Sequence, residues 1–193
     1  MSRPHTLDDA AARRAVLSAA DREFYAHGVA GVGMTEIRDS SAVSLKRLYG
    51  LYPSKRELVV AWLDDRHVTW MTWFTGAIER LAAAGTDPLL APFDAIAEWA
   101  ATPGYRGCAF LNTAAEVTEI DDTHRSIIAA HKQAVTDHLS GIARGVGAAH
   151  PDALGVALAV LLDGAIVQSA VFGSVAPIAA AGSAATVLIA SAR

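Results

Sequence analysis

The sequence is poor in the features that mark secreted proteins and most enzymes. Cys108 is the one cysteine in 193 residues, which excludes an intrachain disulfide and suits a reducing cytoplasm. An HExxH motif, a glycine-rich phosphate loop, a nucleophile–base pair and paired catalytic carboxylates are all missing. The first residues contain acids and no apolar run, so we expect no secretory signal. These absences favour a cytoplasmic protein that is not an enzyme and uses no cofactor.

Charge is sparse and unevenly spread. Charged residues make up 19% of the chain and hydrophobic residues 52%, which hints at a buried interface. Residues 1–66 carry a net charge of +1 and residues 67–193 a net charge of −5. If the protein binds a polyanion, we expect the first part to face it and the acidic part to face away.

The segment 164–192 contains no charged side chain over twenty-nine residues. That length could span a bilayer, so a membrane-anchored protein is one reading. The segment is rich in Ala, Gly and Ser, and Gly173 and Pro177 break it into two pieces. We therefore favour a protein without membrane contact, in which two uncharged helices from each of two copies form a four-helix dimer interface.

The stretch 34–55 predicts a helix-turn-helix. A first helix is expected over Thr35–Ser41, with Ile37 as its apolar anchor. Ala42 and Val43 follow as the turn. Ser44 is a good N-cap for a second short helix over Leu45–Leu51, because its hydroxyl can accept a hydrogen bond from an exposed backbone N–H.

The second short helix is expected to present a basic and aromatic face. Leu48 and Leu51 face the core at helical spacing, whereas Lys46, Arg47 and Tyr49 point elsewhere. A short helix of this kind fits the major groove of DNA, and basic side chains neutralise phosphates. A solvated basic face without a partner is the alternative.

Residues spread over about positions 10–60 carry a resemblance to a known family. They are Arg13, Arg14, Phe24, His27, Gly28, Ile37, Ala42, Val43, Ser44, Leu48, Tyr49, Tyr52, Pro53, Ser54, Lys55 and Leu58. This pattern resembles the N-terminal domain of the tetracycline-repressor (TetR) family of transcriptional regulators. Three positions depart from it: Ala42 replaces a turn glycine, Gly33 replaces a capping Ser or Thr, and Gly50 replaces a bulkier side chain.

The resemblance implies an all-α protein of two domains. Residues 1–53 would form a three-helix DNA-binding domain with the helix-turn-helix, and residues 54–193 a helical ligand-binding and dimerisation domain. The implied function is that of a repressor released from a palindromic operator by a small molecule. Its partners would be double-stranded DNA, an unidentified effector and a second copy of the chain. A helical enzyme or ligand carrier without DNA binding is the rival interpretation.

Two sets of site residues follow from this interpretation. The DNA-binding set places Thr35, Ser44, Leu45, Lys46 and Arg47 near bases, and Tyr49 and Lys55 on phosphates. Lys55 opens a long helix behind the capping-box residues Ser54 and Glu57, and a helix N-terminus beside a lysine is suited to phosphate. The dimer-interface set is Leu158, Leu162, Ile166 and Val187.

The long helix that begins at Ser54 carries four large rings: Trp62, Trp70, Trp73 and Phe74. Core packing, the lining of a ligand pocket and cofactor stacking all remain open for them. The ligand-binding set that we predict is Trp70, Trp73, Phe74, Trp99, Cys108 and Phe110. Some family members with a cysteine at the place of Cys108 respond to electrophiles; the alternative is a small buried residue without chemistry.

Three histidines, His124, His131 and His138, recur every seven residues on one predicted helix. Seven helical residues rise roughly 10 Å, which is too far for two of these side chains to share one zinc ion. We therefore predict no metal site and read the histidines as a stripe along one helix face.

Overall fold

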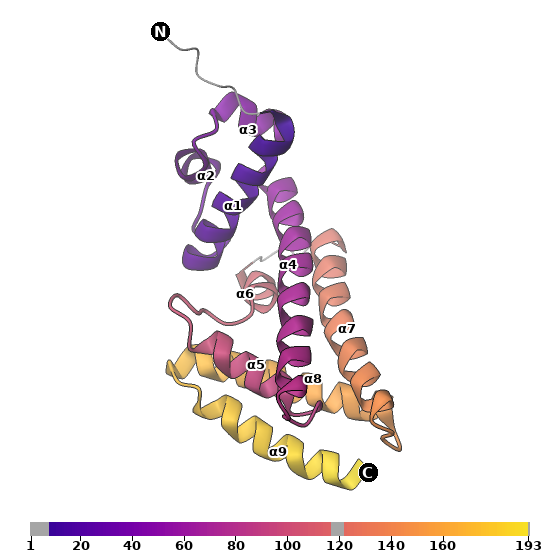
Figure 1. The fold of residues 1–193 in the computed structure, drawn as a ribbon. Helices are drawn as coiled ribbons and strands as arrows, with labels where there is room; N and C mark the ends of the chain where they lie inside the picture. The colour runs from indigo at the N-terminus through magenta and orange to yellow at the C-terminus, as the bar shows by residue number, and fades with distance from the viewer. Residues whose placement is uncertain (1–7, 117–121, 193) are drawn as a thin grey trace. The chain divides into compact units, whose positions relative to one another are not determined.

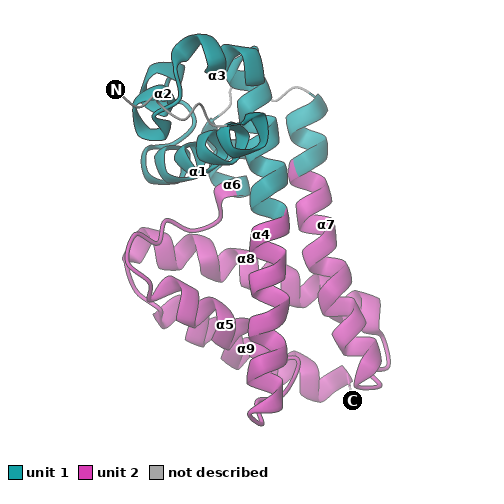
Figure 2. Ribbon diagram, turned by 45° about the horizontal axis from the view of Figure 1, so that its top comes forward, with its two compact units in different colours: residues 1–67, 110–127 teal, residues 68–109, 128–193 magenta. Residues whose placement is uncertain are grey.

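The structure is a computed structural model that describes residues 8–116 and 122–192, and these residues form nine α-helices and no strand (Figure 1). The predicted all-α fold is therefore confirmed. The helices group into two compact units (Figure 2): unit 1 comprises residues 1–67 and 110–127, and unit 2 comprises residues 68–109 and 128–193. The predicted domain boundary at residue 53 falls inside unit 1.

Unit 1 is built on three N-terminal helices, α1 (Asp9–His27), α2 (Met34–Ser41) and α3 (Leu45–Leu51). The unit also contains the start of α4 (Lys55–Ala83), most of α6 (Ala109–Glu116) and the start of α7 (Asp122–Gly145). Its core is apolar and fully buried at Val16, Ile37, Leu48, Leu58 and Trp62. The predicted second helix, Leu45–Leu51, is confirmed residue for residue.

A polar junction at the edge of this core joins α1 to α4. The Asp21 carboxylate accepts a hydrogen bond from the Trp62 indole at 2.8 Å and one from the Arg66 guanidinium at 2.5 Å. The Arg66 guanidinium also lies 4.1 Å from the ring centroid of Tyr25. Phe24 packs edge-on against Trp62 with ring centroids 5.2 Å apart. The first turns of α4 are thus fixed to α1.

Unit 2 contains the rest of α4 and α7 together with α5 (Ala91–Ala100), α8 (Pro151–Phe172) and α9 (Ala176–Ala192). α8 packs along α9, and α5 covers both of them (Figure 1). α7 and α8 approach so closely that a Cβ atom on Gly155 would lie 2.1 Å from the Ser140 hydroxyl. The two helices are therefore tightly packed at Gly155, with no room there for a side chain.

Among the described helices, α8 is long and apolar enough to cross a membrane by length and composition alone. This property is shared by the core helices of soluble proteins, and one such helix is weak evidence. The α8 residues Leu158 and Leu162 are almost fully buried inside unit 2.

Candidate nucleic-acid interface and aromatic cluster

The helix-turn-helix has the turn and the cap that the sequence predicts. Ala42 adopts the left-handed conformation, with φ 55° and ψ 20°, and is the one non-glycine residue with positive φ in the described chain. The Ser44 hydroxyl accepts a hydrogen bond from the Arg47 N–H at 3.4 Å. Gly33 has no side chain with which to cap α2, and the Glu36 carboxylate accepts its N–H at 3.1 Å instead.

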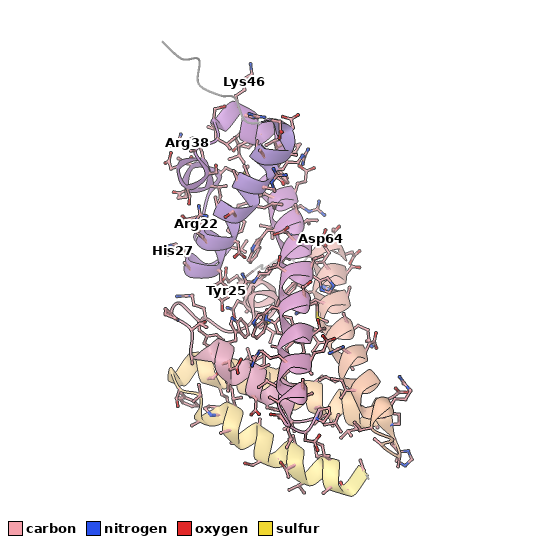
Figure 3. The ribbon with its side chains drawn as sticks, in the orientation of Figure 1. Arg22, Tyr25, His27, Arg38, Lys46 and Asp64 are labelled. Atoms are coloured by element: carbon pink, nitrogen blue, oxygen red, sulfur yellow. The ribbon has the colours of Figure 1, made fainter. Side chains whose placement is uncertain are left out.

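The outward face of α3 is formed by Lys46, Tyr49 and Gly50. Leu48 and Leu51 are buried, whereas Lys46 is exposed and Tyr49 is 45% exposed. Figure 3 shows the Lys46 side chain extending away from the ribbon. A Cβ atom on Gly50 would meet nothing within 4 Å, so this side of the helix is open. A cation and an aromatic hydroxyl on an open helix face can contact phosphates and base edges.

Arg47 lies on the side of α3 that faces α1. Its guanidinium forms an ion pair with the Asp9 carboxylate at 3.0 Å. The prediction placed Arg47 near bases and did not foresee this partner, which is 38 residues away in the sequence. The Nη2 atom of Arg47 is thus engaged by Asp9.

The other predicted DNA contacts lie in the first turn of α2, at the start of α3 and at the start of α4. Thr35 is exposed in the first turn of α2, Ser44 is exposed, and Leu45 is half-buried. The α4 capping box is confirmed, because the Glu57 N–H donates to the Ser54 hydroxyl at 3.2 Å and the Ser54 N–H donates to the Glu57 carboxylate at 3.1 Å.

Lys55, the first residue of α4, is half-buried rather than fully exposed. Burial lowers the pKa of its ammonium group, and the nearby carboxylates of Glu116 and Glu36 oppose that shift. An ammonium group near two carboxylates is partly neutralised before it meets a phosphate. Glu116 ends α6, far from Lys55 in the sequence, and no local pattern indicates its influence.

Four of the predicted ligand-binding residues lie together in unit 2. Trp70, Trp73 and Trp99 in unit 2 form a triangle with ring centroids 5.9–6.0 Å apart. Trp70 also stacks on the buried ring of Phe74 at 4.6 Å. Tyr105, which was not predicted, meets Trp99 edge-on at 4.9 Å. We call these five residues the aromatic cluster; its rings touch one another, so core packing is part of their role.

The last two predicted ligand-binding residues, Cys108 and Phe110, are both buried. Cys108 is a free thiol in unit 2, just before α6, and is 7% exposed. Burial of this kind limits the access of electrophiles to the sulfur. Phe110 belongs to unit 1 and is buried there.

Two of the three heptad histidines border the aromatic cluster. His131 is buried and meets Trp70 edge-on at 5.3 Å, and His138 lies 6.2 Å from the Phe74 centroid. The Nε2 atom of His138 is buried and has no hydrogen-bond partner. Burial lowers the pKa of His138, and the Glu79 carboxylate opposes the shift. Over the described residues, no group of three His, Cys, Asp or Glu side chains is placed to hold a metal ion.

The predicted dimer residues divide into two kinds. Leu158, Leu162 and Ile166 are 0–2% exposed and pack inside unit 2, so they offer no surface to a second chain. Val187 on α9 is 69% exposed and remains available.

Comparison with known proteins agrees with this geometry. Residues 16–62 match the family model for bacterial regulatory proteins of the tetR family. The curated proteins contain no match to this chain. A TetR-family transcriptional regulator from Streptomyces coelicolor is similar in structure, with a TM-score of 0.83, 29% identity and coverage of 95% of this chain and 96% of that chain.

Two further solved structures share the fold at lower identity. Regulatory protein TetR from Rhodobacter sphaeroides has a TM-score of 0.77 at 19% identity, covering 90% of this chain and 96% of that one. A TetR transcriptional regulator from Chloroflexus aurantiacus has a TM-score of 0.77 at 21% identity, covering 93% and 94%. Residues 16–62, with the capped helix-turn-helix, thus match the DNA-binding domain of the tetR family of bacterial regulatory proteins, and the chain as a whole has the fold of TetR-family transcriptional regulators.

Proposed function

We propose that this regulator is a homodimeric repressor that leaves a palindromic operator when a small molecule binds to it. DNA binding is assigned to residues 1–53 together with the start of α4, and effector binding and dimerisation to the remainder. The observation that carries the DNA-binding part is the open outward face of α3, with Lys46 and Tyr49 exposed on a helix whose apolar side is fully buried.

Contacts to DNA divide by the position of each side chain. Thr35, Ser44, Lys46 and Tyr49 are exposed on or beside α2 and α3 and can reach base edges or the adjoining backbone. Leu45 is half-buried at the start of α3 and offers an apolar contact, for example to a thymine methyl group. Lys55 lies at the N-terminus of α4, where helix dipole and ammonium charge together favour a phosphate.

A second copy of the chain is the partner proposed for the outer side of α8. Val156, Val160, Val167 and Val171 recur at helical spacing on that side and are exposed, with Val160 at 67% and Val171 at 74%. Val187 adds an exposed valine on α9. Exposed apolar stripes of this kind mark association surfaces, and a helix-turn-helix regulator needs two copies to read a two-fold symmetric site.

The effector is proposed to bind at the aromatic cluster. Trp73 is 36% exposed, so the cluster reaches the surface. The flat faces of the tryptophan rings suit an apolar or aromatic molecule. α4 carries Trp70 and Trp73 as well as Lys55, so a molecule that separates the rings would act on the helix that begins beside the DNA contacts. Such a molecule releases DNA only if it binds the DNA-free state more tightly than the DNA-bound state.

Selection of DNA from a random pool tests the proposal. We expect the purified protein to enrich duplexes with two inverted half-sites whose centres lie about one helical turn, roughly 34–36 Å, apart. A small molecule retained by the protein, found by native mass spectrometry, should release the selected duplex when it is added back. Enrichment of single, non-repeated sites, or no release by any retained or added small molecule, would contradict the proposal.

A further inference from the structure

The last residue of α6 contacts the loop that joins α1 to α2. The Glu116 carboxylate accepts a hydrogen bond from the Ala30 N–H at 3.0 Å. The two residues are 86 positions apart in the sequence, and both belong to unit 1. This loop leads directly into α2, the first helix of the helix-turn-helix. A side chain from the C-terminal half of the chain therefore holds the entry to the DNA-binding motif.

Gly28 leaves the space that the Glu116 carboxylate occupies. It ends α1 with φ +81°, and its N–H donates to the Phe24 carbonyl at 2.9 Å. A Cβ atom on Gly28 would lie 2.7 Å from one Glu116 oxygen and 2.8 Å from the other. Real Cβ atoms essentially never come so close, so the end of the Glu116 side chain would have to shift if position 28 carried a side chain. The space beside Gly28 and the hydrogen bond from Ala30 thus both place the Glu116 carboxylate against the loop that joins α1 to α2.

The same carboxylate acts on the start of α4. Glu116 is the larger of two acidic influences on Lys55, and Glu36 of α2 is the other. The Glu116 charge thus acts on a lysine that the proposed function places on a DNA phosphate. The backbone contact to Ala30 and the charge near Lys55 can be separated by substitution, because glutamine retains an acceptor oxygen but carries no charge.

We propose that Glu116 is a positioning residue through which α6 fixes the α1–α2 loop, and with it α2 and α3, in the arrangement that recognises the operator. This inference rests on the proposed function and adds a route for regulation. α6 begins at Ala109 and ends at Glu116, so the position of its C-terminal end determines whether the carboxylate reaches the loop.

The test compares Glu116→Ala with Glu116→Gln, and Asp64→Asn serves as the matched control. Asp64 is an exposed carboxylate on α4 in the same unit, so its substitution changes the charge equally. Two quantities are measured in the full-length protein. They are the exchange rate of the Ala30 amide hydrogen and the ratio of affinities for a duplex selected by the wild type and for a mixed-sequence duplex.

We expect Glu116→Ala to speed Ala30 exchange and to lower the affinity ratio, each by about tenfold, because the Ala30 N–H loses its acceptor. Glu116→Gln keeps an acceptor, so both quantities should stay within about twofold of wild type, as in Asp64→Asn. Any other combination overturns the inference, including faster exchange without a change in the affinity ratio.

Gly28→Ala gives an independent measurement. The backbone strain of alanine at position 28 does not depend on the residue at position 116. The clash with the carboxylate, by contrast, is present only when residue 116 is glutamate. In wild type, Gly28→Ala should lower the affinity ratio by about tenfold, and in the Glu116→Ala background the further loss should be about threefold or less. Equal losses in the two backgrounds overturn the inference. If Gly28→Ala does not fold, the Glu116 variants decide alone.

Failure of this inference is distinguishable from failure of the proposed function. A wild-type protein that enriches no two-fold symmetric duplex overturns the proposed function and the inference that rests on it. A wild-type protein that enriches such a duplex, with Glu116→Ala behaving as Asp64→Asn, overturns the inference alone.

Discussion

Two helices of this chain turn contrasting faces away from their cores. α3 in unit 1 presents Lys46 and Tyr49, whereas α8 in unit 2 presents a row of valines. A charged and aromatic face is well hydrated and exchanges its counterions for DNA phosphates. An aliphatic face gains about 1.5 kcal/mol for each valine that a second apolar surface removes from water. The contrast agrees with the proposed division, in which unit 1 recognises DNA and unit 2 associates with a second copy of the chain.

Charges on the α8 face should give the largest effect. We expect Val160→Glu combined with Val171→Glu to yield a monomer by light scattering, because two carboxylates cannot be buried in an apolar interface. Affinity for the selected duplex should then fall by about 100-fold or more, since the two half-sites are no longer bound together. Val68→Glu, at an exposed valine on α4, is the control and should remain dimeric. If the double variant were still dimeric, the proposal that α8 forms the dimer interface would be wrong.

The inner side of α8 should be intolerant of the smallest addition. Gly155→Ala forces a methyl group against the hydroxyl and backbone of Ser140, so we expect it to lower the free energy of unfolding by about 3 kcal/mol. Gly141→Ala is the matched change on α7, where a Cβ would meet nothing within 4 Å, and it should stabilise by about 0.5–1 kcal/mol. Denaturant unfolding measures both. Equal effects would show that the contact between α7 and α8 is not tight in solution.

Two basic residues beside the α3 face should differ in the kind of binding that they support. Arg47→Ala should weaken binding to the selected duplex by about 1–2 kcal/mol and binding to mixed DNA much less, if the guanidinium leaves Asp9 for a base. Lys55→Ala should weaken both duplexes alike and lower the salt slope by about one, as expected for a phosphate contact. Anisotropy titrations at several salt concentrations measure this. If each variant lost the same affinity for the selected duplex as for mixed DNA, the proposed division between a base contact at Arg47 and a phosphate contact at Lys55 would be wrong.

The turn between α2 and α3 should give the smallest effect. Ala42 is held at φ 55°, a conformation that costs alanine about 1–2 kcal/mol and glycine much less. After allowance for the greater chain entropy of glycine, Ala42→Gly should stabilise the protein by about 0.5–1 kcal/mol. Ala130→Gly, at an exposed position in the middle of α7, should instead destabilise it by about 1 kcal/mol. Thermal melts of the two variants should therefore shift in opposite directions.

The α3 region could be predicted from the sequence because its signals are local. Ser44, Leu48 and Leu51 lie within eight residues, and cap and helical spacing together define the helix. α8 gave no such guidance, because it is apolar all round and periodicity does not tell its core side from its outer side. The prediction therefore took Leu158, Leu162 and Ile166 for the dimer face, whereas they fill the core.

Long-range polar contacts were also invisible to sequence reasoning. The Asp9–Arg47 ion pair and the Glu116–Ala30 hydrogen bond join residues 38 and 86 positions apart. Nothing in the local pattern around either carboxylate indicates its partner, because the packing of whole helices brings them together. The aromatic cluster shows the same limit: Trp70, Trp73 and Phe74 share one helix, but Trp99 and Tyr105 arrive from elsewhere in unit 2.

The central claim is that the outward face of α3 lies against DNA. It is tested most directly by the salt-dependent affinity of wild type and of the Lys46→Ala, Tyr49→Ala double variant for the selected duplex. The account predicts tight, steeply salt-dependent binding by wild type and a loss of about 2 kcal/mol or more in a double variant that remains folded and dimeric. A folded double variant that binds the selected duplex as tightly as wild type would contradict it.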